Sequence, residues 1–278
     1  MALNIPAGFF VQALSNELKS ELVSVAHALA DAARPVTLRH FRQSALTAEN
    51  KLADGFDPVT IADRGSERAM REILAARRPD DGILGEEFGT SQGSSGLTWV
   101  LDPIDGTRGY ISGTPTWGVL VAVNAGGAPI YGIIDQPYVG ERFEGGFGVH
   151  SMVGPLGRRE LATRRSVDLG DAILFSTFPE VGTGAEEAAF AALSKHVRLT
   201  RYGMDCYGYA LVAVGQVDLV VEAGLLAYDV QAPIAVVTAA GGVVTDWQGR
   251  PAHNGGRIIA AGSAELHAQA LEILSKVA

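Results

Sequence analysis

The sequence predicts an α+β fold in which helices are layered on two β-sheets, and three observations point to it. Two helix-like segments, with apolar residues at every third or fourth position, come early in the chain. Residues 117–149 have the pattern of antiparallel strands, and strand-like and helix-like segments alternate from 171 to 276. Because no linker, repeat or low-complexity tract divides the chain, we expect one domain, 1–278, built from two packed halves of about 1–160 and 161–278.

The first half opens with the two helices. One is expected over 13–33, where leucines recur at threes and fours, and Pro35 is expected to kink or end it because proline lacks an N–H. The other is expected over 62–78, where apolar residues share one face among many charges.

Strands follow, and the first two end in acidic residues. The stretch ILGEEFG predicts a short strand entering a loop, and an apolar strand is expected at 98–101, ended by Pro103 and Gly106. Over 117–149, WGVLVAVN, PIYGIIDQP and ERFEGGFG predict a meander. No G-x-G-x-x-G or Walker lysine motif occurs, so three glycines are interpreted as turn residues rather than a phosphate cradle: Gly145, Gly146 and Gly148.

The second half alternates between strands and helices. Strands are expected in DAILFSTF, VDLVVE, GGVVTDWQG and RIIAAG. Helices are expected over 184–195, 205–215, 229–240 and 263–276.

Composition narrows the classes of function. Lys and Arg number 22 against 31 Asp and Glu, so the net charge is −9 and neither nucleic acid nor an anionic membrane is an expected partner. The one cysteine, Cys206, excludes an intramolecular disulfide and a Cys-rich zinc site. The N-terminus lacks a basic n-region and no apolar stretch approaches about 20 residues, so we expect a cytoplasmic protein.

The motif DPIDGT at 102–107 is the strongest candidate for chemistry. Asp102 and Asp105, three apart on a turn, can converge on one point, and Gly106 lets backbone N–H groups approach an anion. Carboxylates so placed suit a hard cation and a phosphate. The alternative is a solvated Asp-rich turn that caps the following segment.

Other acidic residues also lie at the predicted end of a strand or start of a helix. Glu86 and Glu87 end a strand upstream, and Asp229 precedes a predicted helix. Asp229 is also typical of a helix N-cap, and Glu87 fits a surface or supporting residue better than a metal ligand.

Four motifs, in order, resemble those of the inositol-monophosphatase superfamily: DPVT at 57–60 with Asp63 behind it, GEEFG at 85–89, WVLDPIDGT at 99–107 and YDVQAPIAVVTAAGG at 228–242. The resemblance runs from about residue 20 to the C-terminus. It implies an αβαβα sandwich of the inositol-monophosphatase and sugar-phosphatase type. It also implies Mg²⁺-dependent hydrolysis of a small phosphorylated metabolite, a phosphate monoester, by a homodimer.

The resemblance also implies a set of metal ligands. Glu86, Asp102 and the carbonyl of Ile104 would bind one magnesium ion, and Asp102, Asp105 and Asp229 another, with two or three ions per site. Together the ions would polarise the phosphoryl group and activate water.

Roles in the reaction follow from the same resemblance. Thr107 and Glu86 would orient and deprotonate the attacking water, with Asp63 supporting Thr107, and the N–H groups of Gly106 and Thr107 would hold the phosphate. The sequence departs from the family pattern at 230–233, VQAP, where many relatives have small residues, so the helix there could be shifted.

Longer runs are most similar to the histidinol-phosphatases of this superfamily: FDPVTIADRGSERAM, ILGEEFG, DPIDGTRGYISGTPTWG and YGMDCYGYALVAVGQVDLVVEAGL. Asp205 and Glu222 are then expected to bind substrate, because histidinol carries an ammonium group and an imidazole. Alternatively, Asp205 caps the 205–215 helix. An inositol-1-monophosphatase or a broad small-molecule phosphatase remains the alternative function.

Two rival interpretations fit less well. Residues 89–93 match G-x-S-x-G, but a Gly/Ser loop surrounds them where a nucleophile elbow needs a strand and then a helix. The six histidines are scattered and form no H-E-x-x-H. A metal-binding regulatory protein without activity is the non-enzyme alternative, and a phosphate-release assay would decide it.

Overall fold

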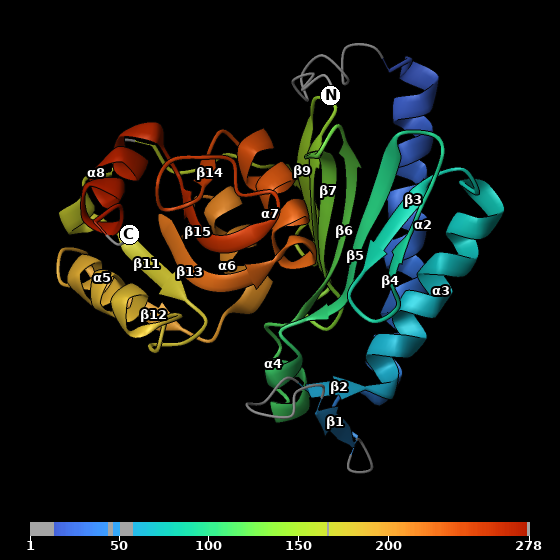
Figure 1. The fold of residues 1–278 in the computed structure, drawn as a ribbon, viewed down its shortest axis with the longest axis horizontal. Helices are drawn as coiled ribbons and strands as arrows, with labels where there is room; N and C mark the ends of the chain where they lie inside the picture. Colours follow the sequence, from blue (N-terminus) through green and yellow to red (C-terminus); the bar gives the residue numbers. More distant parts are fainter. Residues whose placement is uncertain (1–13, 44–46, 51–57, 166, 277–278) are drawn as a thin grey trace.

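The computed structural model describes residues 14–43, 47–50, 58–165 and 167–276. Five layers follow one another: a helix pair, an eight-stranded sheet, a second helix pair, a five-stranded sheet and a third helix pair (Figure 1). This is the αβαβα arrangement that the sequence predicts. None of the helices in the described ranges is long and apolar enough to cross a bilayer.

Helices α2 (Asn16–His40) and α3 (Ile61–Arg77) cover the outer face of the large sheet (Figure 1). Ser15 caps α2, accepting a 3.2 Å hydrogen bond from Leu18 N. The expected end of α2 near 33 is wrong, since the helix continues through Pro35. Buried residues on both sides of the proline, such as Ala33 and Thr37, pack the helix onto the sheet, and this packing outweighs one lost hydrogen bond.

The large sheet has the strand order β10-β9-β8-β7-β6-β5-β3-β4. Only the β3–β5 pair is parallel, so the predicted antiparallel meander is confirmed. Strands β4 and β10 at the two edges were not predicted. The strands are β3 (Gly82–Gly85), β4 (Gly89–Ser91), β5 (Leu97–Asp105), β6 (Gly118–Ala125), β7 (Ala128–Gln136), β8 (Glu141–Gly146), β9 (Val149–Gly154) and β10 (Gly157–Glu160).

Strand β5 does not end at Pro103, contrary to expectation. It runs to Asp105, and its pairing with β6 shifts between Asp102 and Asp105. Proline is tolerated there because an irregular register does not need its missing N–H. The short helix α4 (Thr107–Ser112) and the two-stranded ribbon of β1 (Ala48–Asn50) and β2 (Pro58–Thr60) lie beyond this end of the strand (Figure 1).

The second sheet has the order β12-β11-β13-β15-β14. Helices α6 (Asp205–Ala213) and α7 (Ala227–Ala239) lie between the two sheets, and α5 (Gly184–Ser194) and α8 (Ala264–Leu274) cover the far face (Figure 1). A 3₁₀ turn at Leu169–Asp171 precedes the sheet. The strands are β11 (Ile173–Ser176), β12 (Leu199–Tyr202), β13 (Leu219–Leu226), β14 (Val243–Thr245) and β15 (Gly255–Ala261).

Helix α7 lies close against the large sheet because two strand positions have no side chain. A Cβ on Gly132 would lie 2.8 Å from the Ala232 carbonyl oxygen, and one on Gly145 would lie 2.6 Å from Val236 Cα. Gly145 therefore serves close packing rather than a turn, whereas Gly148, at φ +83°, fits the predicted turn. None of the three glycines at 145–148 lines the pocket that the acidic residues at the ends of β3 and β5 surround, so the interpretation that they are not a phosphate cradle is kept.

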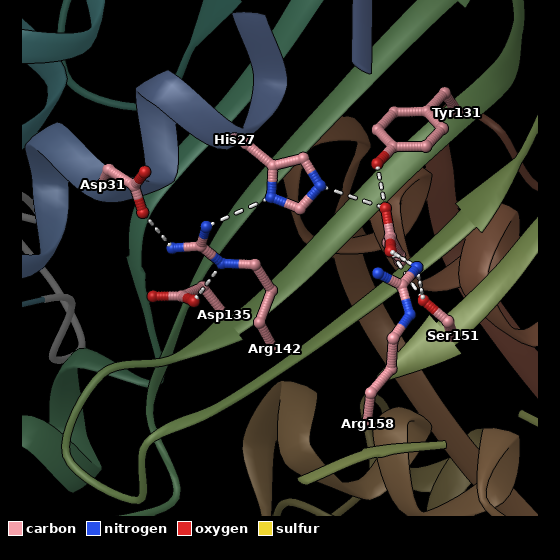
Figure 2. A network of polar contacts seen from close by, with 8 residues as sticks. His27, Asp31, Tyr131, Asp135, Arg142, Ser151 and Arg158 are labelled. Atoms are coloured by element: carbon pink, nitrogen blue, oxygen red, sulfur yellow. Dashed lines mark hydrogen bonds and ion pairs between the residues drawn. The ribbon is translucent and has the colours of Figure 1, made fainter. Parts of the chain in front are cut away.

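A polar network ties α2 to the same sheet (Figure 2). Arg142 Nη1 donates to His27 Nδ1 at 3.2 Å, so His27 Nε2 carries the proton that bonds Glu144 at 3.0 Å. Arg142 and Arg34 also bond the fully buried Asp135. Buried acids here are thus paired, which removes most of the cost of burying their charges.

Candidate active site

The parallel register of β3 and β5 brings two acidic residues together. Gly85 lies opposite Leu101, and Glu86 N donates to the Leu101 carbonyl at 3.2 Å. The residues that follow in each strand, Glu86 and Asp102, therefore lie side by side. Both line the same pocket, as expected of metal ligands.

The irregular end of β5 turns Asp105 towards the same pocket. Asp102 Oδ1 accepts a 3.0 Å hydrogen bond from Ile104 N, which closes the turn. Asp105 Oδ2 accepts a 2.6 Å bond from Cys206 N in α6. The motif is therefore not a solvated turn, since Asp102 is only 2% exposed.

Asp229 joins this group from the opposite side. Helix α7 begins at Ala227, two residues earlier than expected, and Leu226 is its N-cap. Asp229 lies in the first turn and accepts a 2.6 Å bond from Leu226 N. The departure from the family pattern after it does not remove Asp229 from the site: carboxylate oxygens of Asp102, Asp105 and Asp229 all lie within 4.8 Å of one another.

The electrostatics of these acids fit a divalent cation. Burial, and then the charges of Glu86, Asp105 and Asp229, raise the pKa of Asp102. Burial, and then Asp229 and Asp205, raise the pKa of Asp105 against the hydrogen bond from Cys206. Converging carboxylates repel one another unless positive charge lies between them. An all-oxygen donor set is the one that Mg²⁺ prefers, so these residues fit that ion.

Thr107 is held beside the cluster by Asp63. Its hydroxyl lies 3.0 Å from the Ile104 carbonyl and 3.3 Å from Asp63 Oδ1. The other carboxylate oxygen of Asp63 accepts from Thr60 N and Thr60 Oγ1 at 2.9 and 2.6 Å. Asp63 thus completes the capping box at the start of α3 and also orients the hydroxyl of Thr107. Asp57, in the same motif, lies outside the described residues.

Gly106 makes room for Asp205. Its φ is +84°, and a Cβ there would lie 2.6 Å from Asp205 Cγ. Asp205 itself has φ +47° and accepts a 2.9 Å bond from Thr116 Oγ1. The N-cap of α6 is Met204, so the alternative that Asp205 caps this helix is wrong. Burial raises the pKa of Asp205, and Thr116 and Arg108 oppose the rise.

Glu222 lies on β13, 6% exposed, with donors on both oxygens. Thr177 N and Thr177 Oγ1 donate to Oε1, the first at 3.1 Å, and Tyr209 OH donates to Oε2 at 2.8 Å. Burial raises its pKa to about 7 against these hydrogen bonds. Its carboxylate therefore organises the wall of the pocket.

Every site residue predicted from the sequence, except Asp63, lines one pocket of about 380 Å³, a size suited to a small metabolite. Several further residues that line it were not predicted as site residues from the sequence: Arg108, Ser176, Thr177, Phe178, Glu180, Val181, Gly182, Cys206, Tyr209, Ala223, Gly224 and Leu225. Arg108 lies in α4, and Cys206 and Tyr209 lie in α6, whereas the others lie in loops or near strand ends, and no motif marks any of them.

Glu67 is a further residue that the sequence analysis missed. It is fully buried, and its carboxylate accepts from Glu87 N at 2.7 Å and Phe88 N at 3.3 Å, which fixes the turn that carries Glu86. Its position on the buried face of α3, four residues after Asp63, was the available signal. Glu87 itself does not line the pocket, and its side chain lies 3.9 Å from Arg64 Nε.

The structure contradicts a nucleophile elbow of the serine-hydrolase type at residues 89–93. Ser91 lies in the exposed edge strand β4, and its hydroxyl accepts from Arg71 Nη1 at 3.0 Å. No helix follows it before β5.

Comparison with known proteins decides the family. The sequence profile named "Inositol monophosphatase family" matches residues 18–278, nearly the whole chain. The chain belongs to the inositol monophosphatase family. Its fold and its ordered motifs are those of this family.

Relatives within the family differ in the substrates that their names give. "Bifunctional phosphatase IMPL2, chloroplastic" of Arabidopsis thaliana is 38% identical over 94% of this chain and 79% of its own length. "Histidinol-phosphatase" of Streptomyces coelicolor is 34% identical over 91% of this chain and 96% of its own length. A solved inositol monophosphatase from Zymomonas mobilis is 40% identical, with TM-score 0.82, covering 94% of this chain and 100% of that one.

Proposed function

We propose that this phosphatase is a Mg²⁺-dependent histidinol-phosphatase that hydrolyses L-histidinol phosphate to L-histidinol and phosphate. The observation that carries the proposal is the surplus of carboxylates in one pocket. Among the described residues, three acids besides the four assigned to metal line it against a single arginine, and they are Glu180, Asp205 and Glu222. A substrate with a cationic alcohol portion suits such a pocket better than inositol, which offers hydroxyls alone.

The proposed metal ligands are the acidic residues at the ends of β3 and β5 and in the first turn of α7. Glu86, Asp102 and the Ile104 carbonyl form one proposed ligand set, and Asp102, Asp105 and Asp229 the other. Bound Mg²⁺ supplies Lewis acidity towards the phosphoryl oxygens and lowers the pKa of water. Cys206 N and Leu226 N each hold one ligand carboxylate in place before any cation binds.

Thr107 and Glu86 are the proposed residues for activating water. A hydroxyl has one proton, and Thr107 has two acceptors within reach, Ile104 O and Asp63 Oδ1. When the Ile104 carbonyl serves as a ligand, the proton turns to Asp63. The lone pairs of Thr107 then accept a hydrogen bond from the attacking water, and Glu86 takes its proton.

The turn at Gly106 orients the phosphate. Backbone N–H groups of Gly106 and Thr107 are the proposed donors, and the positive φ of Gly106 lets this backbone approach an anion without a Cβ. Asp205 and Glu222 also line the pocket, and they are the proposed contacts of the alcohol portion.

Substrate preference is the experiment that tests this proposal. We expect kcat/KM for histidinol phosphate to exceed that for inositol 1-phosphate and for glycerol 2-phosphate by at least about tenfold. A preference for inositol 1-phosphate would support the second candidate, an inositol-1-monophosphatase, which the likeness to the Zymomonas mobilis structure favours. Equal rates would indicate a broad phosphatase, and no phosphate release from any ester would indicate a regulatory protein.

A further inference from the structure

Three carboxylates among the pocket residues that the structure describes are not assigned to metal, and their surroundings differ. Asp205 accepts a 2.9 Å hydrogen bond from Thr116 Oγ1, and the nearby Arg108 opposes the rise in its pKa that burial causes. Glu222 has both oxygens bonded to Thr177 and Tyr209. Glu180 is exposed, and no hydrogen bond or ion pair with another described residue reaches its carboxylate. Glu180 is therefore the acid available to a ligand.

The loop that carries Glu180 is anchored at both ends on β13. At its start, Thr177 bonds Glu222 through both its N–H and its hydroxyl. At its end, Gly182 has φ +67°, and a Cβ there would lie 2.8 Å from Ala223 Cβ and would contact the Glu186 carboxylate. Glu222 and Ala223 are neighbours in β13, so one strand determines where the loop lies.

The residues on either side of Glu180 restrict it further. Pro179 fixes one backbone angle, and Val181 is only 4% exposed and packs in the core outside the second sheet. A glutamate between a proline and a buried valine loses little backbone freedom when it binds a ligand. The loop is thus organised before substrate arrives.

Arg108 packs against an aromatic ring of the loop that carries Glu180. Its guanidinium carbon lies 4.9 Å from the ring centroid of Phe178, a cation–π contact that joins α4 to the loop. Because Asp205 attracts the same guanidinium, the one basic side chain among the described lining residues has partners of its own.

We propose that Glu180 determines specificity by pairing with an ammonium group on the alcohol portion of the substrate. The substrate class is the phosphate monoesters of amino alcohols whose amine is carried on the carbon next to the ester carbon. Phe178 forms the apolar wall beside that group, and Glu222 acts as a positioning residue through Thr177. This inference rests on the proposed function and names the residue that would give it selectivity.

Two pairs of substrates, each differing by one amine, test the proposal. They are histidinol phosphate with its desamino analogue, and phosphoethanolamine with ethyl phosphate. We expect Glu180→Gln to lower kcat/KM for both amines about five- to twentyfold, through KM, and to change both amine-free esters less than about twofold. A group remote from phosphorus binds ground and transition states alike, so kcat should stay constant.

Controls separate charge from structure. Glu187→Gln removes the charge of an exposed glutamate of α5 that does not line the pocket, and it should leave kcat/KM unchanged for all four esters. Glu222→Gln should lower kcat/KM for all four esters, because it disturbs the anchor of the loop. Added salt should weaken the preference for the amine in the wild type and not in Glu180→Gln.

The outcomes distinguish this inference from the proposed function. An equal effect of Glu180→Gln on amine and amine-free esters, or a wild type that prefers neither amine, overturns the role of Glu180. If phosphoethanolamine shows the expected pattern while inositol 1-phosphate is the better substrate than histidinol phosphate, the role of Glu180 stands and the histidinol assignment fails.

Discussion

The carboxylate of Asp105 accepts a 2.6 Å hydrogen bond from the backbone N–H of Cys206, 101 positions later in the chain. The bond joins the end of β5 to the first turn of α6, so it connects the large sheet with the helices between the sheets. A proposed metal ligand is thereby held by the part of the chain that also carries Asp205.

Replacement of Asp105 by asparagine tests the ligand assignment. The amide oxygen can still accept from Cys206, so we expect the melting temperature to change little. Loss of the charge should reduce kcat to below about a tenth, or more than ~1.4 kcal/mol of transition-state stabilisation. Asp168→Asn, at an exposed position outside the pocket, is the control. Retention of more than a tenth of kcat would contradict the assignment.

Divalent cations should be required for activity and should stabilise the fold. We expect chelation to abolish phosphate release, Mg²⁺ to restore it, Mn²⁺ to substitute and Ca²⁺ to inhibit, since Ca²⁺ takes longer and looser coordination. Mg²⁺ should also raise the melting temperature of the wild type more than that of Asp105→Asn, because it binds the native cluster. Full activity after exhaustive chelation would disprove the proposed mechanism.

Asp205→Asn should change selectivity. Asparagine tolerates the positive φ of this residue, but the change removes a negative charge near Arg108, so a cationic substrate loses attraction to Asp205 and is repelled more strongly by the arginine. We expect kcat/KM for histidinol phosphate to fall roughly ten- to a hundredfold, with little change for inositol 1-phosphate. Steady-state kinetics on both substrates is the measurement. A uniform loss would show that Asp205 supports the turn at Gly106 instead.

Gly106→Ala should damage the site more than the fold. Both Gly106, at φ +84°, and Gly127, at φ +86°, would acquire strain of about 1–2 kcal/mol as alanine. A Cβ at Gly127 meets nothing within 4 Å, whereas one at Gly106 meets Asp205. We therefore expect similar small losses of stability in both variants but a large loss of kcat only in Gly106→Ala. Equal kcat values in the two variants would show that the close approach of Gly106 to Asp205 does not affect catalysis.

Acid should remove the contribution of Glu144 to stability. Burial opposes its ionisation, but hydrogen bonds from His27, Ser151 and Tyr131 outweigh burial and lower its pKa to about 2, from an ordinary 4.5 (Figure 2). An acid with a lowered folded-state pKa stabilises the native state above its unfolded pKa and loses that effect as pH falls through the folded value.

The free energy of unfolding of the wild type and of Glu144→Gln, measured by denaturant between pH 3 and pH 6, checks this expectation. The wild type should be the more stable protein at pH 6, and the difference should shrink progressively below about pH 4.5. A difference that is independent of pH would mean that shape, rather than charge, accounts for the effect of Glu144.

Several features of this protein were determined by the sequence alone. Apolar periodicity placed α3 and α8 to within two residues of their observed ends, and alternation identified the meander. Ordered motifs identified the family and the acids at 102, 105 and 229. These features could be predicted because each depends on neighbours within a few residues.

Other features were decided only by tertiary structure. Proline usually ends a helix or a strand, but neither element ends at its proline here. Helix α2 continues past Pro35 because its packing on the sheet outweighs the lost hydrogen bond, and β5 continues past Pro103 because its register with β6 is irregular there. The position of Glu86 beside Asp102 depends on the alignment of two strands. Glu67, buried under the turn at 86–87, depends on the same alignment.

The pocket wall is the clearest example of this division. The sequence marks Asp205 and Glu222 as acids, but only the fold shows that Thr116 bonds one and that Thr177 and Tyr209 bond the other. Glu180 carries no motif and stands out only because β13 anchors both ends of its loop at the pocket. A sequence determines which charges a chain has, whereas the packing of distant segments decides which of those charges remain available to a ligand.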